Sequence, residues 1–436
     1  MYIIFITVSK YILIALMAVY AIQCFSVFSH DDKKERDGIY LRQVAPMSSV
    51  YLLSFLLLYI ETGDSLLLKF YALTQIIIWA LILLYRYMYP EASKLLVNNM
   101  CMLMSTGFVI LSRLNFDKAK KQFIVALVSI AMAVVIPYIL KKFKRLRRFY
   151  LFLAAAGAAS LLTVLLFSTS VNGSKLSIMI GGMSFQASEF VKIIFVFSMA
   201  GMLTCMNEKY RILSATVTAA IHVLLLVASK DLGSAVIFFM VYVIMLFVAT
   251  GRLSYFIIGL AGAAVCSVLG YVMFSHVRVR VAAFSDPLSN IDGSGYQIAQ
   301  SLFAIGTGGF DGMGLMQGAP YRIPVVEADF IFAAICEEFG ALYGICLLLI
   351  CISCFIMFMN IAMRFKDMFY KLVAVGLAAT YGFQVFLTVG GVTKFIPLTG
   401  VTLPLVSYGS NSIMVSLIMF SVIQGLYVSV NSSNIT

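Results

Sequence analysis

Apolar runs long enough to cross a lipid bilayer recur from one end of this chain to the other. Of its 436 residues, 62% are hydrophobic and only 11% are charged, so the runs are seldom interrupted. Backbone polar groups in lipid must bond within their own segment, and the runs have the length of helices rather than of barrel strands. The sequence therefore predicts an all-α polytopic membrane protein and excludes a soluble globular core. Thirteen spans are expected, at residues 3–28, 48–62, 66–86, 96–112, 121–141, 149–168, 188–205, 210–229, 233–250, 254–275, 329–360, 368–393 and 404–428.

The net charge of +12 is explained by where the basic residues stand. They crowd the ends of spans, as in KKFKRLRR (141–148) and RFKDMFYK (364–371), which is typical of cytoplasmic loops. This placement favours topology determinants over a nucleic-acid or lipid-recognition patch, and no nucleic-acid partner is expected. If both segments are cytoplasmic, counting spans places residues 169–187 and 276–328 outside and the C-terminus inside.

One loop contradicts the positive-inside rule, by which basic residues gather in cytoplasmic loops. Residues 113–121 (RLNFDKAKK) fall outside in this count although they include four basic residues. Either the count slips by one span nearby, or these residues have a function.

The first three spans are loosely composed and differ from the rest of the chain. Residues 1–90 are expected to form an accessory set of transmembrane helices. Residues 91–436 are expected to carry the function, with a large extracellular loop at 276–328, because charged and Gly/Pro-rich loops begin to accompany the helices there.

Ionisable groups inside or beside membrane helices are costly, so each is a functional candidate. Glu189 and Lys192 are three residues apart near a helix start, where they lie on one face and can pair. Two roles stay open for this pair. It stabilises the helix only, or it also contacts an anionic ligand. Asp231 begins an apolar helix, and capping of that helix is favoured over chemistry.

A long polar stretch combines cations with carboxylates. Basic groups suit a phosphate or diphosphate, while carboxylates suit a general base or a divalent cation such as Mg²⁺ or Mn²⁺. Its glycines would let the backbone approach a ligand closely, although a flexible loop is the favoured explanation for them. The charged and amide residues concerned are Arg278, Arg280, Asp286, Asn290, Asp292, Glu327, Asp329, Glu337 and Glu338.

A second irregular stretch, GGVTKFIPLTGVTLPLVSYGSNS (390–412), separates the last two spans. It contains Lys394, two prolines, Ser407 and Tyr408. Broken backbone of this composition is typical of a segment lining a protected cavity, and a plain extracellular turn is the alternative.

Six motifs in a fixed order identify a resemblance to the SEDS family (shape, elongation, division and sporulation), whose members include FtsW, RodA and SpoVE. The resemblance covers about residues 96–428 and implies a ten-helix core, to which about three N-terminal helices are added. The motifs are NGSK (172–175), FQASEFVK (185–192), KDLGSA (230–235), GSGYQIAQSLFAIGTGGFDGMGL (293–315), IPVVEADFIFAAICEEFG (323–340) and IPLTGVTLPLVSYG (396–409).

The resemblance implies a peptidoglycan glycosyltransferase of the bacterial cytoplasmic membrane. Such enzymes polymerise glycan strands from lipid II at the outer face, usually beside a class B penicillin-binding protein. A lipid-linked donor brings its own diphosphate, so no nucleotide-binding loop is needed, while the acceptor hydroxyl needs a base and the leaving diphosphate needs positive charge. The expected substrate-binding residues are Arg278, Arg280, Glu189, Lys192, Asp329, Lys394, Ser407 and Tyr408. A supporting role is expected for Asp231, Glu337, Glu338 and Gln297.

The expected catalytic position departs from the family pattern. The pattern F-x-N/D-P-x-x-D-P-x-G-S-G-Y-Q, laid on Phe284 to Gln297, places Asn290 where the family's proposed catalytic Asp stands. An amide cannot act as a general base, so Asp292 and Asp286 are the nearby carboxylates that could substitute. Further departures are Ala187 and Lys230 in place of proline, Ser177 in place of tryptophan, and Ser410 with Asn411 in what is commonly SYGGSS.

Three functions therefore stay open. The leading one is a divergent glycan polymerase with Asp292 or Asp286 as base. The second is a protein that binds lipid II or acts as a scaffold without catalysis, which Asn290 favours. The third, a flippase for lipid-linked precursors, is disfavoured because alternating access needs polar sites near the midplane of the membrane. A role in division, elongation or sporulation is not distinguished.

Overall fold

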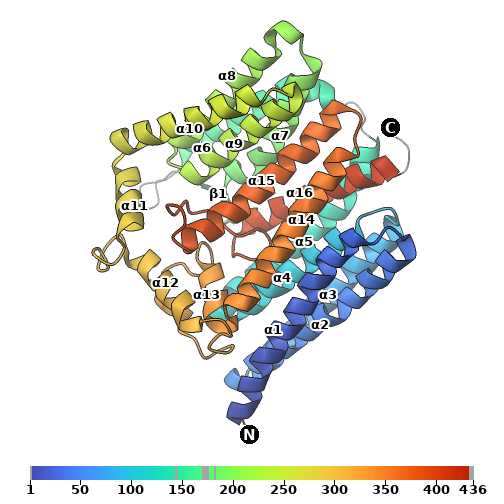
Figure 1. Cartoon of the computed structure of the whole chain (residues 1–436), viewed down its shortest axis with the longest axis vertical. Helices are drawn as coiled ribbons and strands as arrows, with labels where there is room; N and C mark the ends of the chain where they lie inside the picture. The colour runs from blue at the N-terminus through green and yellow to red at the C-terminus, as the bar shows by residue number, and fades with distance from the viewer. Residues whose placement is uncertain (1, 143–145, 169–175, 181–182, 432–436) are drawn as a thin grey trace. The chain divides into compact units, whose positions relative to one another are not determined.

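The computed structural model describes residues 2–142, 146–168, 176–180 and 183–431 of the chain. The NGSK motif at 172–175 lies outside these residues. Within them the elements are α1 (Tyr2–Ser26), η1 (Val27–Ser29), α2 (Lys33–Thr62), α3 (Ser65–Met88), α4 (Lys94–Leu114), α5 (Phe116–Lys142), η2 (Leu146–Phe149), α6 (Tyr150–Phe167), β1 (Ile178–Ile180), β2 (Met183–Phe185), α7 (Ala187–Cys205), α8 (Glu208–Ala228), α9 (Leu232–Thr250), α10 (Leu253–Met273), α11 (Ser275–Ser285), α12 (Tyr296–Gly308), η3 (Pro320–Arg322), α13 (Ile331–Phe339), α14 (Ala341–Met363), α15 (Met368–Val392) and α16 (Ser410–Asn431) (Figure 1).

Thirteen of the helices in the described part of the chain are long and apolar enough to cross a membrane. This confirms the prediction of an all-α polytopic protein with thirteen spans. The three helices outside this set, α11, α12 and α13, lie in or directly after the long polar stretch, which is therefore partly helical.

One expected span is divided. The run predicted as a single helix over 329–360 forms α13 and α14, with a break at Gly340, whose φ is 90°. A Cβ atom at this position would lie 2.5 Å from the carbonyl oxygen of Phe310, so a side chain does not fit. The close approach of two backbone segments ends the helix here.

Caps explain where several helices begin. The Asp32 side chain accepts a hydrogen bond from Lys34 N (3.1 Å), and Asp64 accepts one from Leu66 N (2.9 Å). Because Asp32 caps α2, the charged segment after it forms the first turns of that helix. The helix thus begins at Lys33, well before the expected start at residue 48.

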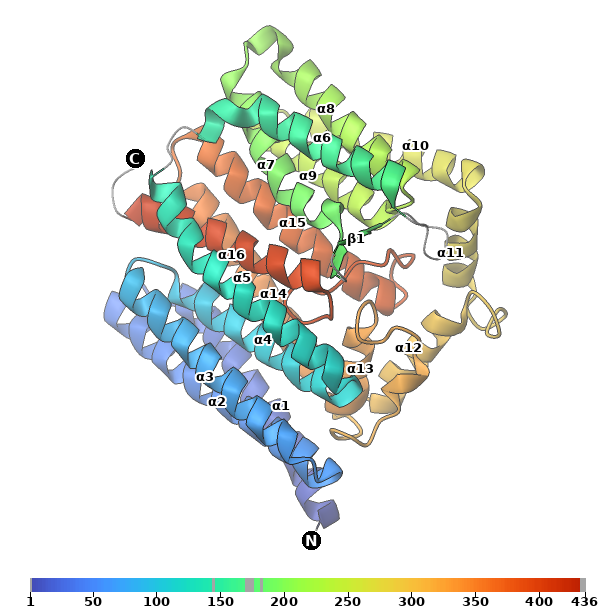
Figure 2. The same ribbon diagram turned by 180° about the vertical axis from the view of Figure 1, so that it is seen from behind.

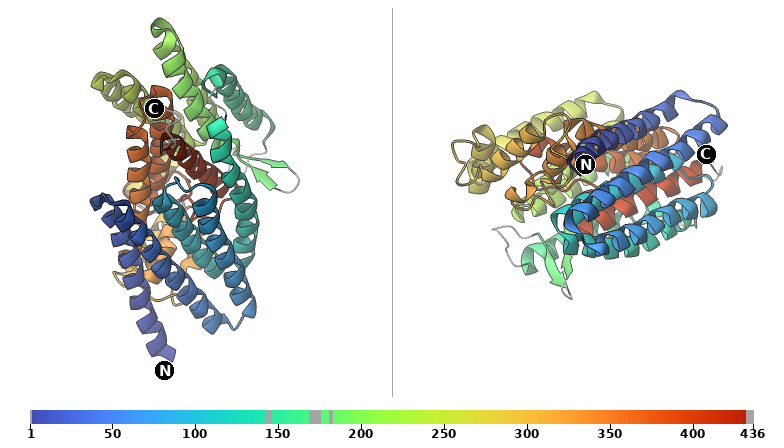
Figure 3. Two further views of the ribbon diagram at one scale, coloured as in Figure 1. Left: turned by 90° about the vertical axis from the view of Figure 1, so that its right-hand side faces the viewer. Right: turned by 90° about the horizontal axis from the view of Figure 1, so that it is seen from below.

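The chain divides into two compact units. Unit one consists of residues 1–130, 280–356 and 388–409, and unit two of residues 131–279, 357–387 and 410–436. In unit one, α2 packs against α1, α3 and α4, and α3 also lies along α4, as seen from behind in Figure 2. In unit two, α7 and α8 pack on each other and on both α6 and α9, and α10 packs on α9. The strands β1 and β2 form an antiparallel hairpin, drawn as two short arrows in Figure 3.

Buried hydrogen bonds connect the N-terminal helices with the rest of unit one. Asn99 of α4 accepts hydrogen bonds at Oδ1 from the Tyr20 hydroxyl (3.0 Å) and the Cys24 thiol (3.1 Å). Its Nδ2 donates to the Ser353 hydroxyl of α14 (2.6 Å). Polar bonds of this kind contribute to helix association in lipid, where apolar contact alone gives little preference. The division at residue 90 stays a prediction.

Candidate functional site

Residues 113–121, expected as a loop, are almost wholly helical, because α4 ends at Leu114 and α5 begins at Phe116. Their basic side chains are paired with carboxylates of unit one. Arg113 Nε lies 2.8 Å from Oε1 of Glu338, which is fully buried, and its NH2 donates to the carbonyl of Gly318 (3.1 Å). Lys118 pairs with Glu327, and Lys120 pairs with Asp117. Three of the four basic residues at 113–121 thus have a carboxylate partner.

The segment before α13 is held at two successive carbonyl groups. The carbonyl of Glu327 accepts a hydrogen bond from Tyr408 N (2.8 Å), and that of Ala328 accepts one from the Ser407 hydroxyl (2.6 Å). The Ser407 oxygen also accepts from Leu403 N (2.9 Å). Two chain segments far apart in sequence are thereby fixed to each other.

Gln122 of α5 fixes the same loop from the other side. Its Nε2 donates to the carbonyl of Ser407 (2.8 Å), and its Oε1 accepts from Gly409 N (3.0 Å). The side chain is buried. Lys118, one turn earlier on α5, lies with Nζ 5.5 Å from the centre of the Tyr408 ring. We call this arrangement of Lys118, Gln122, Glu327, Ser407 and Tyr408 the loop clamp.

Asp329 follows directly on the clamped carbonyl groups. Burial raises the pKa of its carboxyl from 3.8 to about 6, while the positive charge of Arg280 lowers this pKa and the charge of Glu327 raises it. Arg280 NH1 lies 3.4 Å from the carbonyl oxygen of Leu398 and 3.5 Å from that of Thr399. The next residue, Gly400, has a φ of 75°, and a Cβ atom there would meet Asp329 Oδ2 at 3.6 Å.

The backbone is strained on both sides of the clamp. Val325 has a φ of 57° and Leu405 a φ of 66°. Such values are costly for residues other than glycine, above all for a β-branched one. Strain of this kind persists where the surroundings hold the chain, and it gathers at functional sites.

Glu337 and Glu338 accept hydrogen bonds from the segment 309–319 and hold it against α13. Met313 N donates to the carbonyl of Glu337, and Gly314 N donates to that of Glu338, each at 2.9 Å. The Glu337 carboxylate accepts from Ala319 N (2.8 Å). Burial raises the pKa of Glu338 to about 7 even though Arg113 lowers it. Both side chains thus have structural contacts.

The loop with the three expected catalytic positions is exposed. Asp286 Oδ1 accepts a hydrogen bond from Ser289 N (3.1 Å), and Asn290 Nδ2 donates to the Ser289 hydroxyl (3.4 Å). Asp292 is exposed in the same turn. A Cβ atom at Gly295 would lie 2.3 Å from the Pro287 carbonyl oxygen, so the turn needs glycine there. The side-chain bonds of Asp286 and Asn290 lie within the turn.

Three other expected site residues occupy separate positions. Arg278 is exposed and donates from NH1 to the carbonyl of Val272 (2.9 Å). Lys394 has a φ of 56° in the turn after α15. Gln297 lies partly buried in the first turn of α12.

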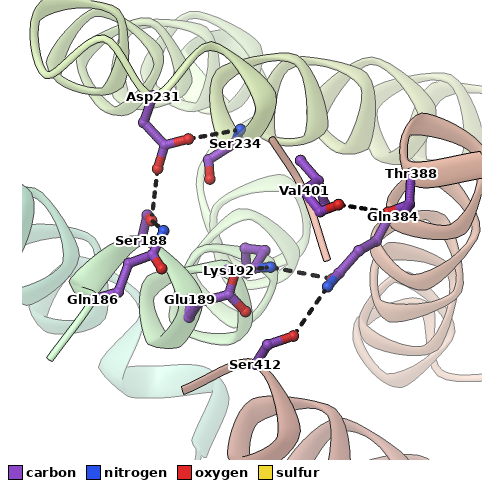
Figure 4. A network of polar contacts seen from close by, with 10 residues as sticks. All are labelled: Gln186, Ser188, Glu189, Lys192, Asp231, Ser234, Gln384, Thr388, Val401 and Ser412. Carbon is purple, nitrogen blue, oxygen red and sulfur yellow. Dashed lines mark hydrogen bonds and ion pairs between the residues drawn. The ribbon is translucent and has the colours of Figure 1, made fainter. Parts of the chain in front are cut away.

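Unit two contains a buried charge pair, shown in Figure 4. Lys192 Nζ lies 2.8 Å from Glu189 Oε1, and the side chains are 2% and 9% exposed. Lys192 also donates to Gln384 Oε1 (3.2 Å), and Gln384 Nε2 donates to the Ser412 hydroxyl (3.5 Å). The pair therefore belongs to a hydrogen-bonded network that connects α7, α15 and α16.

Asp231 is the N-cap residue of α9. It accepts hydrogen bonds from Ser234 N (3.1 Å) and from the Ser188 hydroxyl of α7 (2.8 Å), as Figure 4 shows. Lys230, which stands where the resemblance expects proline, has a φ of 61°. Proline cannot adopt this φ, so the substitution coincides with a different local backbone.

A divalent cation would need several oxygen ligands together. Over the described ranges, no three or more His, Cys, Asp or Glu side chains gather closely enough to hold a metal ion. The carboxylates present do not form such a site, and no chemical step is assigned to a metal.

Sequence reasoning missed Arg113, Lys118 and Gln122 as site residues, and it named Glu327 in the polar stretch without giving it a role. The charge-rule violation at 113–121 was the one signal that pointed to the first two. Gln122 could have been noticed as an amide at the start of a long apolar run.

Comparison with known proteins gives the family. Residues 86–432 match the FtsW/RodA/SpoVE family model, described as cell cycle protein. Peptidoglycan glycosyltransferase RodA of Mycobacterium bovis is 32% identical over 363 residues, which is 77% of each chain. Stage V sporulation protein E of Bacillus subtilis is 33% identical over 261 residues, which cover 58% of this chain and 71% of that protein.

Solved structures show the same fold. A peptidoglycan synthase complex studied for the coordination of polymerization and crosslinking includes a chain with a TM-score of 0.65 and 21% identity, covering 78% of this chain and 98% of that one. The crystal structure of the rod shape determining protein RodA of Thermus thermophilus gives a TM-score of 0.56 at 21% identity, covering 78% of this chain and 97% of that one. With the family match extending over most of its length, the chain belongs to the FtsW/RodA/SpoVE family, the SEDS proteins.

Proposed function

We propose that this chain is a peptidoglycan glycosyltransferase that polymerises glycan strands from lipid II at the outer face of the bacterial cytoplasmic membrane. The observation that carries the proposal is the place of Arg280 beside Asp329, a cation and a carboxylate presented by the long polar stretch of a family member. Relatives at 32% identity are named peptidoglycan glycosyltransferases, which supports the same reaction here.

The reaction needs one proton acceptor and one source of positive charge. A sugar hydroxyl of the acceptor attacks the anomeric carbon of the donor and gives its proton to a carboxylate. The bond from that carbon to the diphosphate oxygen breaks, and the electron pair leaves with the diphosphate. Arg280, together with Arg278 and Lys394, supplies charge for the diphosphate, and the base is one of the carboxylates of the long polar stretch.

The test is polymerisation of lipid II by the purified full-length protein in liposomes, with glycan products separated by length. The wild-type protein is expected to form polymer, and Arg280→Gln is expected to form it more slowly. A wild-type protein that forms no polymer, alone or with a class B penicillin-binding protein, overturns the proposal.

One observation favours a second function. Asn290 stands at the expected catalytic position, so the chain could bind lipid II as a scaffold without catalysis. In that case the wild-type protein binds lipid II but forms no polymer, and Asn290→Asp gains activity. The third function is flipping of lipid II. It would be detected in the same liposomes as a change in the fraction of lipid II headgroups accessible at the outer surface.

A class B penicillin-binding protein is the proposed partner. The synthase complex with the same fold couples polymerization to crosslinking, which supports a crosslinking partner for this chain. Copurification from membranes, followed by the rate of polymerisation with and without the partner, tests the assignment.

A further inference from the structure

We propose that Asp329, rather than Asp286 or Asp292, is the proton acceptor of this glycosyltransferase. The proposal rests on the proposed polymerase function and names the residue that carries out its first step. It is suggested by the combination of an amide at position 290 with a carboxylate at position 329 that the surrounding chain holds in place.

A general base must be fixed in position. Both carbonyl groups that precede Asp329 are hydrogen-bonded, to Tyr408 N and to the Ser407 hydroxyl. Phe330, directly after it, is 1% exposed, and α13 begins at the next residue. Asp329 therefore stands on a backbone with little freedom, whereas Asp286 and Asp292 lie in an exposed turn.

A general base must also keep a lone pair for the substrate. The other carboxylates nearby each have a partner: Glu327 pairs with Lys118, Glu338 with Arg113, and Glu337 accepts from a backbone N–H. The second oxygens of Glu337 and Glu338 have no hydrogen-bond partner among the described residues, but both are fully buried. For Asp329 the described residues provide no hydrogen-bond donor, only the charge of Arg280. Its oxygens are thus available to accept a hydrogen bond from an acceptor hydroxyl.

A glycine in the left-handed region lies beside the carboxylate. Gly400 has a φ of 75°, and a Cβ atom there would project to within 3.6 Å of Asp329 Oδ2. The positive φ would strain any other residue at 400, whereas the Cβ atom itself would make only an ordinary van der Waals contact with the carboxylate. Arg280 contacts the carbonyls of Leu398 and Thr399, so the same turn holds a cation near the base.

The acidity of Asp329 suits the role. Burial raises its pKa to about 6, with Arg280 lowering and Glu327 raising it. A base with a pKa just below neutral is ionised at working pH and takes up a proton more readily than an ordinary Asp. The charged groups that act on it are Arg280 from α11 and Glu327 from the segment before α13, the latter paired with Lys118 of α5.

The step balances as follows. The acceptor O–H bond breaks and its proton passes to Asp329, while the hydroxyl oxygen forms a bond with the anomeric carbon. The bond between that carbon and the diphosphate oxygen breaks, and its electron pair stays on the diphosphate. Asp329 then returns its proton to water.

The experiment compares Asp329→Asn and Asp329→Glu with the double variant Asp286→Ala/Asp292→Ala in the full-length protein. Polymerisation of lipid II, binding of lipid II and thermal unfolding are measured for each. Asp329→Asn is expected to lose roughly 10²- to 10⁴-fold in rate while it still binds lipid II. Asp329→Glu is expected to restore part of the rate with a shifted pH profile, and the double variant is expected to stay active.

Three results would overturn the assignment: wild-type rate in Asp329→Asn, failure of Asp329→Glu to restore any rate in a folded protein, or loss of the rate in the double variant alone. A wild-type protein that binds lipid II without forming polymer would overturn the proposed function and the role of Asp329 together. An active wild type with an active Asp329→Asn would overturn the role of Asp329 only.

Discussion

The two units treat their buried carboxylates differently. In unit two, Glu189 is paired with Lys192, which also donates to Gln384, so the charges there have close partners. In unit one, Glu327 has Lys118 as a close partner, but Asp329 has only the nearby charge of Arg280. A fully bonded charge pair stabilises the helices that provide it, while a carboxylate without a donor is costly and stays reactive.

The largest effect is expected where the satisfied pair is broken. In Lys192→Met, Glu189 is left buried without its counter-charge, which should lower the free energy of unfolding by roughly 3 to 5 kcal/mol. Chemical unfolding in detergent measures this change in the free energy of unfolding. The double variant Glu189→Gln/Lys192→Met should recover much of the loss, and a single variant as stable as wild type would show that the pair does not hold unit two.

Breaking the loop clamp should have a smaller effect. Gln122→Leu leaves the carbonyl of Ser407 and the N–H of Gly409 without their partner, which should cost roughly 1 to 3 kcal/mol. Gln317→Ala is the matched control, because its bond to Glu61 is exposed and its loss should hardly matter. Equal stability of the two variants would argue against the clamp.

Glu338, a buried carboxylate of unit one, should make the stability of the protein depend on pH. Glu338 has a pKa of about 7 in the folded protein against a usual 4.5, so the folded state binds its proton more tightly than the unfolded state. Stability should therefore rise by about 2 kcal/mol as the pH falls from about 8 to 5.5. The variant Glu338→Gln should lose this part of the slope. A slope unchanged in the variant would contradict the assignment.

The smallest effect concerns the cation beside Asp329. Arg280 lowers the pKa of Asp329, so Arg280→Gln should move the acid limb of the pH–rate profile to higher pH. The rate near neutral pH should fall about tenfold, which corresponds to about 1.4 kcal/mol. Arg278 is exposed and lies two residues before Arg280, so Arg278→Gln should leave the acid limb of the pH–rate profile in place. Identical shifts in both variants would indicate a general charge effect.

The fold could be predicted almost completely from the sequence, and the site only in part. An apolar run that crosses a bilayer must satisfy its own backbone hydrogen bonds, as a helix does. The length and ends of the run therefore determine each helix. Asp329, Ser407 and Tyr408 could be named because they stand in polar stretches at the ends of expected spans. The partners that hold them could not, because Lys118 and Glu327 are 209 residues apart and Gln122 and Ser407 are 285 apart. Contacts at such separations leave no periodic pattern. The division of 329–360 at Gly340 was missed for the same reason, since it depends on the approach of Phe310.

Asn99 has a consequence for the biosynthesis of the protein. Its Oδ1 can meet Tyr20 and Cys24 as soon as the first four helices are made, but its Nδ2 must wait for Ser353, which is 254 residues further along the chain. At a synthesis rate of about 5 to 20 residues per second, that wait lasts roughly 13 to 50 seconds. During this time one half of a membrane-buried amide lacks its native partner. The nascent helices therefore keep a polar position that α14 can fill when it is inserted, which couples the assembly of the N-terminal helices to the completion of unit one.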